Sequence, residues 1–153
     1  MTAGLLWVMA TGCLPPDLRD QHASAVEAFE LATDVDPEAP FVDPRQALGP
    51  PDGRTVAIGV DTFITLRFFR AIPDGPGADL RVYELGEDGA RAEVAVSLDG
   101  VTFTALRPHA TGLVTEYDLS AAGFDRVGYV RIRGLDRAGD EPGYDLDALE
   151  AVH

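Results

Sequence analysis

The amino-acid sequence predicts an all-β fold, an antiparallel two-sheet β-sandwich (jelly roll) of about eight strands. Three observations support this prediction. Apolar side chains recur with a period of about two after residue 40, and no window there keeps a helical period. Runs rich in branched and aromatic residues follow one another about every ten residues. Gly and Pro separate these runs, as in 49–53 (GPPDG), 73–77 (PDGPG) and 86–89 (GEDG).

Each predicted strand follows from alternation within its own run. In 62–69 (TFITLRFF) every second side chain from Ile64 onward is apolar, so these side chains share one face. In 129–133 (YVRIR) the tyrosine and the two arginines face away from the valine and the isoleucine. The expected strands cover residues 55–60, 62–69, 80–84, 92–98, 102–106, 129–133 and 144–152.

Two local signals complete the predicted fold. Asp99-Gly100 marks a hairpin between two of the strands, because this dipeptide favours the positive φ angles of tight hairpin turns. The segment 23–32 (ASAVEAFELA) fits either a short helix or a first strand, and the residues leave this choice open.

The length of 153 residues suits one structural domain, preceded by a processing segment. We divide the chain into a signal- or lipobox-like segment at 1–13, a tether at 14–27 and the jelly-roll domain at 28–153. The apolar run 5–10 (LLWVMA) is too short to span a bilayer, which takes about 20 residues.

Small residues lead from this run to Cys13, as in a bacterial lipobox, where the cysteine thiol is lipidated. The expected location is therefore the bacterial cell envelope or the outside of the cell. An ordinary signal peptide and a buried free cysteine remain the alternatives. Cys13 is the only cysteine, so the chain has no internal disulfide.

The charge balance restricts the partners. The chain has 12 Lys+Arg against 26 Asp+Glu, a net charge of −14, and all of its cations are arginines. Such a chain is poorly suited to nucleic acid or to an anionic membrane surface, so a membrane contact is expected only through a lipid anchor. Cations, neutral sugars and basic proteins remain as partners.

Catalytic motifs have little support in this sequence. None of the three serines, Ser24, Ser97 and Ser120, lies in a G-x-S-x-G motif. The zinc motifs H-E-x-x-H and C-x-x-C do not occur. We therefore predict a non-catalytic protein.

Calcium binding has better support, because this hard cation takes oxygen ligands from carboxylates, carbonyls and water. In 48–53 (LGPPDG) the paired prolines remove backbone donors and leave carbonyls free, and Asp52 adds a charge. Alternation in the last strand places Asp145 and Asp147 on one face, about 7 Å apart.

A second acidic site is predicted at the turn 74–79, with Asp74, Asp79 and Glu84 as candidate ligands. Ordinary turn chemistry is the alternative for these acids, since Asp before Gly stabilises turns through its own backbone. Asp145 and Asp147 have a further alternative, which is pairing with Arg131 and Arg133.

Six short motifs in order resemble the galactose-binding-like (discoidin-like) jelly-roll domains of bacterial cell-surface proteins and lipoproteins. The resemblance spans about residues 28–152. The motifs are 47–53 (ALGPPDG), 74–84 (DGPGADLRVYE), 94–103 (VAVSLDGVTF), 117–119 (YDL), 129–132 (YVRI) and 144–150 (YDLDALE).

This resemblance implies a two-sheet sandwich in which an early Asp-Gly loop and an acid on the last strand share a structural calcium ion. The implied ligands are Asp52, Asp145 or Asp147, and carbonyls near Leu48 and Gly49. The resemblance also implies sugar binding by loops at one end. Sugar sites usually use aromatic platforms, and the only Trp lies in the signal-like segment. Glycan and surface protein therefore both stay open as ligands.

We state three hypotheses of function. The first is a non-catalytic cell-envelope lipoprotein that acts as a binding or adhesion module on a calcium-supported jelly roll. The second is a structural subunit of an envelope or extracellular assembly, which predicts self-association. The third is a hydrolase that uses paired acids.

Overall fold

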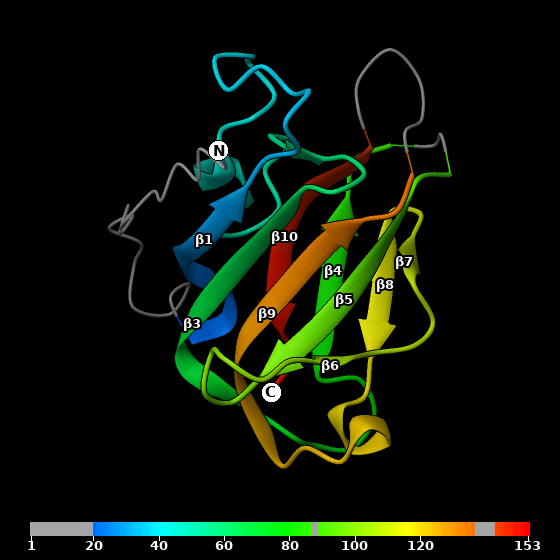
Figure 1. Cartoon of the computed structure of the whole chain (residues 1–153). Helices are drawn as coiled ribbons and strands as arrows, with labels where there is room; N and C mark the ends of the chain where they lie inside the picture. Colours follow the sequence, from blue (N-terminus) through cyan, green and yellow to red (C-terminus); the bar gives the residue numbers. More distant parts are fainter. Residues whose placement is uncertain (1–19, 87–88, 137–142) are drawn as a thin grey trace.

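Two antiparallel β-sheets face each other in the computed structural model, which describes residues 20–86, 89–136 and 143–153 (Figure 1). The first sheet has six strands in the order β1-β3-β9-β5-β6, with β7 paired to β5, and the second has the order β2-β10-β4-β8. The strands are β1 (Ala23–Glu30), β2 (Val56–Ile58), β3 (Phe63–Pro73), β4 (Leu80–Glu84), β5 (Arg91–Ser97), β6 (Thr104–Ala105), β7 (Ala110–Thr111), β8 (Val114–Tyr117), β9 (Arg126–Gly134) and β10 (Tyr144–Ala151). The predicted two-sheet β-sandwich is confirmed.

Two short 3-10 helices, η1 (Pro44–Ala47) and η2 (Leu119–Ala122), lie in connections between strands. None of the helices in the described part of the chain has the length and apolarity that a membrane span requires. The signal-like segment 1–13 and Cys13 lie outside the described residues.

The core lies between the two sheets and follows the predicted period of two. Ile64 and Leu66 of β3 have no exposed surface, and they face Val82 of β4 and Leu149 of β10 in one continuous apolar cluster. The alternate side chains of the six-stranded sheet therefore point outward. This outer face carries the polar and aromatic groups described below.

The segment 23–32, for which the sequence left helix or strand open, forms strand β1 over Ala23–Glu30. It pairs with β3, and the register shifts twice, between Ala23 and Ala25 and between Val26 and Ala28. These irregularities disturb the alternation of side chains, which explains why the pattern did not distinguish strand from helix. Because β1 begins at Ala23, part of the expected tether 14–27 belongs to the sheet.

The hairpin predicted at Asp99-Gly100 connects β5 to β6. Gly100 has a φ of 76°, and the Asp99 carboxylate accepts hydrogen bonds from the backbone N–H groups of Val101 (2.8 Å) and Thr102 (2.9 Å). The hydroxyl of Ser97 donates a third bond at 2.9 Å. These donors hold the pKa of Asp99 below its usual value.

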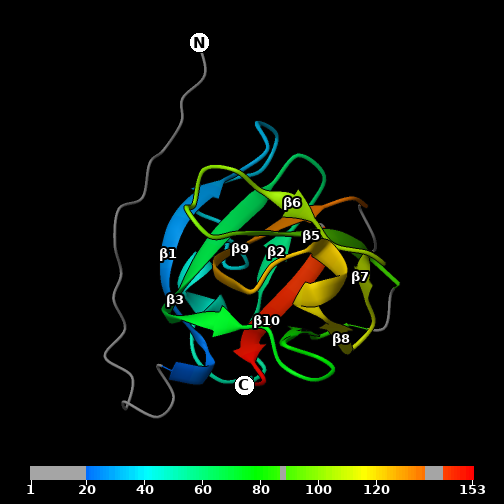
Figure 2. The ribbon, with the colours of Figure 1, turned by 90° about the horizontal axis from the view of Figure 1, so that it is seen from below.

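Strand β10 is central to the four-stranded sheet, because it pairs with β2 on one side and with β4 on the other. A register shift between Leu146 and Ala148 leaves Asp147 as the extra residue of a bulge. The end of β10, helix η2 and the connection from β3 to β4 lie at the same end of the sandwich, from which Figure 2 views the molecule.

Candidate functional site

Asp147 of β10 connects the last strand to the early loop 48–53. One of its carboxylate oxygens accepts a hydrogen bond from the N–H of Asp52 at 3.1 Å, and the other accepts one from the N–H of Gly53 at 3.2 Å. Asp147 is buried, with 6% of its surface exposed. Two amide donors thus join this loop to the last strand directly, and the calcium-mediated link that the resemblance implies stays a prediction.

The other residues predicted for this calcium site have separate roles. The Asp52 carboxylate accepts a hydrogen bond from the N–H of Arg54 at 2.9 Å and forms an ion pair with the Arg54 guanidinium at 3.5 Å. The Leu48 N–H donates to the carbonyl of Arg45, and the Gly49 N–H donates to that of Ala23. The Asp52 carboxylate therefore makes the local bonds that the turn-chemistry alternative expects.

Asp145 lies opposite Ala57 of β2 in the four-stranded sheet. Among the described residues, the group of three carboxylates close enough to hold a metal lies elsewhere and includes neither Asp52, Asp145 nor Asp147. Calcium at these residues stays a prediction.

The alternative pairing of Asp145 and Asp147 with Arg131 and Arg133 is wrong. Arg131 and Arg133 belong to β9 in the opposite sheet, where Arg133 pairs with Glu93 at 3.4 Å. Alternation placed Arg131 and Arg133 on the correct face of β9, but it carried no information about which sheet contains the strand.

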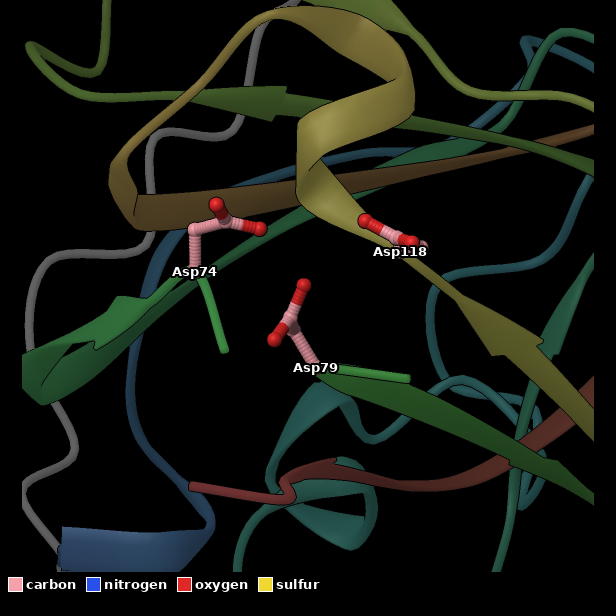
Figure 3. A group of neighbouring side chains, drawn as sticks. All are labelled: Asp74, Asp79 and Asp118. Carbon is pink, nitrogen blue, oxygen red and sulfur yellow. The ribbon is translucent and has the colours of Figure 1, made fainter. Parts of the chain in front are cut away.

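Three carboxylates meet at the end of the sandwich that carries η2 (Figure 3). Asp74, Asp79 and Asp118, here called the acidic cluster, each offer an oxygen, and these oxygens lie within 4.8 Å of one another. Asp74 and Asp79 were both predicted as ligands of a second acidic site. Glu84 lies at the opposite end of β4, where it is buried, so its predicted place with these two residues is wrong.

The buried carboxylate of Asp79 organises the acidic cluster. One oxygen accepts a hydrogen bond from the N–H of Gly75 at 2.7 Å, and the other accepts one from the N–H of Leu119 at 2.8 Å. Asp118 caps the start of η2, where it accepts bonds from the N–H and the hydroxyl of Ser120. The Asp79 side chain thus makes hydrogen bonds both to the turn between β3 and β4 and to the start of η2.

The surroundings of Asp74 disfavour its charged form. Desolvation and then the negative charges of Asp79 and Asp118 raise its pKa above the usual value. The hydrogen bonds from Ser120 lower the pKa of Asp118, so that carboxylate keeps its charge. An arrangement of this kind favours a cation, which would offset the repulsion on Asp74.

A separate open groove of about 350 Å³ lies on the outer face of the six-stranded sheet. It is lined by Phe63, Glu93, Ala95, Phe103, Ala105, Arg131 and Arg133. Strand register explains this arrangement, because Phe63 pairs with Arg133 and Arg133 with Glu93 across three adjacent strands. Arg131 occupies the neighbouring row, opposite Thr65 and Ala95.

The guanidinium of Arg131 is held in place at this groove by three side chains. It lies over the ring of Phe103, 3.9 Å from the centroid, and over that of Phe63 at 5.1 Å. Its Nε donates a hydrogen bond to the hydroxyl of Thr65 at 3.0 Å. Cation–π contacts and this bond fix a long, flexible side chain in one conformation.

The similarities found between this chain and known proteins are to solved structures. No protein-family model matches the chain, and no curated protein matches it. Among solved structures, the chain is similar to the CBM32 of AlyQ in complex with 4,5-unsaturated mannuronic acid, with a TM-score of 0.45 and 15% identity over 63% of this chain and 74% of that chain. It is also similar to a glycoside hydrolase, with a TM-score of 0.36 and 13% identity over 57% of this chain and 19% of that chain.

The residues of the groove were not identified as a site from the sequence. Phe63 carried a usable signal, since it is an aromatic residue on the outward-facing side of a strand whose other face is apolar. Phe103 and Arg131 are distant from it in sequence, and only the order of strands in the sheet brings the three together. Asp118 was missed for the same reason.

Proposed function

We propose that this protein is a non-catalytic binding module that takes a saccharide in the groove on the outer face of the six-stranded sheet. The observation that carries the proposal is the Arg131 guanidinium, fixed over the rings of Phe63 and Phe103 beside Arg133 and Glu93. Aromatic rings pack against the C–H groups of a sugar, while charged groups bind its hydroxyls.

The size and the support of the groove favour a ligand of this class. Its volume of about 350 Å³ falls within the range of small-molecule sites. Phe63 and Arg131 project from the paired strands β3 and β9, so the groove stands on a rigid sheet. The sugar-binding loops that the resemblance implies lie at one end of a sandwich, whereas this groove lies on its face.

The carboxylates favour binding over hydrolysis. A glycosidase needs two carboxyl groups flanking the scissile bond. Glu93 is the one carboxylate among the residues lining the groove, and it pairs with Arg133. In the acidic cluster, both oxygens of Asp79 accept hydrogen bonds from backbone amides, which assigns that side chain a structural role.

Calcium and a lipid anchor belong to the same proposal. Calcium would serve as a structural ion at the acidic cluster, where Asp74 and Asp118 are exposed and the net charge of −14 favours cations. Lipidation at Cys13 would hold the module at the bacterial cell envelope.

The test measures saccharide binding to the full chain by isothermal titration calorimetry against neutral and acidic oligosaccharides. Removing a stacking ring, as in Phe63→Ala or Phe103→Ala, should weaken binding about tenfold. Phe69→Ala is the matched control, since Phe69 is 64% exposed and does not line the groove. Equal affinity in all three variants would place the ligand elsewhere, and no binding to any oligosaccharide would overturn the proposal.

One observation favours the second hypothesis, a subunit of an assembly. Leu85, Leu113 and Val114 are exposed large apolar residues beside β8, which is an edge strand of the four-stranded sheet. Exposed edges of this kind pair between chains. Light scattering at increasing protein concentration tests this function, and Val114→Lys should then lower the measured mass.

A further inference from the structure

Arg131 differs from most of the described arginines in having no acidic partner among the residues that the structure describes. Seven described arginines form an ion pair with a carboxylate: Arg45, Arg54, Arg67, Arg70, Arg81, Arg91 and Arg133. Within the described residues, Arg107, Arg126 and Arg131 do not. Of these three, Arg131 alone is half-buried, and the other two are exposed to solvent.

This lack of a partner is informative because acidic residues are abundant. The chain has 26 Asp+Glu against 12 Lys+Arg, so an arginine without an acid nearby is the exception. A guanidinium that is partly removed from water loses hydration, and cation–π contacts replace only part of that loss. Arg131 is therefore suited to a carboxylate that reaches it from outside the chain.

The geometry leaves one edge of the Arg131 guanidinium available. Its Nε donates to Thr65, and the rings of Phe103 and Phe63 lie against the group. Among the described residues, neither terminal nitrogen (Nη1 or Nη2) makes a hydrogen bond. Two coplanar N–H donors match the two oxygens of a carboxylate.

Arg133 adds a second positive charge on the same face of β9. It lies two residues along the strand from Arg131, a separation of about 7 Å. Its side chain is 50% exposed and its pairing with Glu93 is long, at 3.4 Å, so it has donors to offer a ligand. The groove thus has two guanidinium groups and one carboxylate on a protein with a net charge of −14.

We infer that the saccharide bound in this groove carries a carboxylate, as a uronic acid does, and that this carboxylate pairs with the free edge of Arg131. The inference rests on the proposed function and specifies its ligand class. Arg133 contributes a second, more exposed contact. A neutral sugar offers this edge only uncharged hydroxyl acceptors, whose hydrogen bonds to a guanidinium are weaker than those of a carboxylate, so the groove should bind it less tightly.

The experiment titrates the full chain with matched pairs of oligosaccharides: uronate oligomers of several sugar configurations and the same oligomers after reduction of each carboxyl to an alcohol. Sulfated oligosaccharides form a third set. We expect at least one uronate oligomer to bind about tenfold more tightly than its reduced form. That preference should weaken as the salt concentration rises, because the contact is ionic.

Three variants test whether Arg131 makes the contact with the ligand carboxylate. Arg131→Lys keeps the charge but loses the paired donors, and it should reduce the preference for uronate several-fold. Arg126→Gln is the matched control, since Arg126 lies on the same strand, is exposed and also lacks an acidic partner. Arg133→Gln leaves the contacts of Arg131 intact and should weaken uronate binding without changing the melting temperature, so the inference stays testable if Arg131 variants unfold.

The outcomes separate the two claims. Equal binding of uronate and reduced oligomers, with loss in Phe103→Ala, would overturn the carboxylate inference and leave the saccharide function in place. Tighter binding of sulfated than of uronate oligomers would overturn it as well. Absence of binding to every oligosaccharide would overturn the proposed function itself.

Discussion

The carboxylate of Asp79 accepts a hydrogen bond from the backbone N–H of Leu119 at 2.8 Å, which joins the residue before β4 to the first residue of η2. The same carboxylate accepts a bond from the N–H of Gly75. Asp79 has no exposed surface, so water cannot replace these bonds. One buried side chain therefore fixes two connections at this end of the sandwich.

Removal of the Asp79 carboxylate should destabilise the fold substantially. Asp79→Ala leaves the amides of Gly75 and Leu119 without acceptors, and we expect the free energy of unfolding to fall by about 3 kcal/mol. Urea denaturation followed by circular dichroism measures this change. Asp125→Ala is the control, since Asp125 is exposed and should change the value by less than about 0.5 kcal/mol. Equal losses in both variants would contradict the assigned role.

Asp74→Asn should stabilise the protein at neutral pH in the absence of metal, whereas Asp79→Ala destabilises it. Because the folded-state pKa of Asp74 is raised, protonated Asp74 contributes stability below the unfolded value near 3.8, and that stability is lost as pH rises through the folded pKa. The ionised form is thus unfavourable in the folded protein at neutral pH. Asp74→Asn removes it, so the melting temperature in EDTA should rise at pH 7, and the gain should shrink toward pH 3. A lower melting temperature at pH 7 would show that the repulsion is not significant.

Calcium should stabilise the protein through the acidic cluster. A ligand that binds only the folded state at a hundred times its dissociation constant stabilises by about 2.7 kcal/mol, enough to raise the melting temperature by several degrees. Thermal unfolding in calcium and in EDTA measures the difference. Asp74→Asn should remove it, whereas Asp52→Ala should retain it. The reverse pattern would place the ion at the early loop, and no difference in the unmodified chain would refute calcium binding.

Asp147 and Asp52 should differ sharply in their effect on stability. Asp147→Ala removes the acceptor of two loop amides, and we expect a loss of about 2 kcal/mol together with faster amide hydrogen exchange at 52–53. Asp52→Ala removes an exposed ion pair with Arg54 and should cost less than about 1 kcal/mol. Similar losses in both variants in calcium, but not in EDTA, would instead support a cation shared by the two residues.

Regular alternation made most strands predictable from the sequence, and its interruption explains those that were not. The inward row of β3 and the Asp99-Gly100 hairpin were both identified correctly. β1 was left undecided because its two register shifts break the period. β7 and β8 were missed because they are short and largely exposed, so they lack an apolar pattern.

The sites were predictable only where the residues are close in sequence. Asp74 and Asp79 belong to one turn, and the sequence placed them together. Asp118 joins them only because β8 pairs with β4. The groove depends in the same way on the neighbouring positions of β3, β9 and β5, which no local pattern encodes. The order of strands, rather than the character of each strand, was the missing information.

The central position of β10 has a consequence for how the chain is made. Among the strands that the structure describes, β2 and β4 are joined in their sheet only through β10, which follows the others in the sequence. On the ribosome, the six-stranded sheet can therefore assemble once β9 has emerged, but its apolar inner face stays uncovered by a complete second sheet until β10 is synthesised. Chaperones bind exposed apolar surface of this kind, so we expect them to bind the nascent chain in this state. Of the described strands β10 is therefore the one that completes the sandwich, and a chain interrupted before β10 lacks the strand that joins β2 to β4.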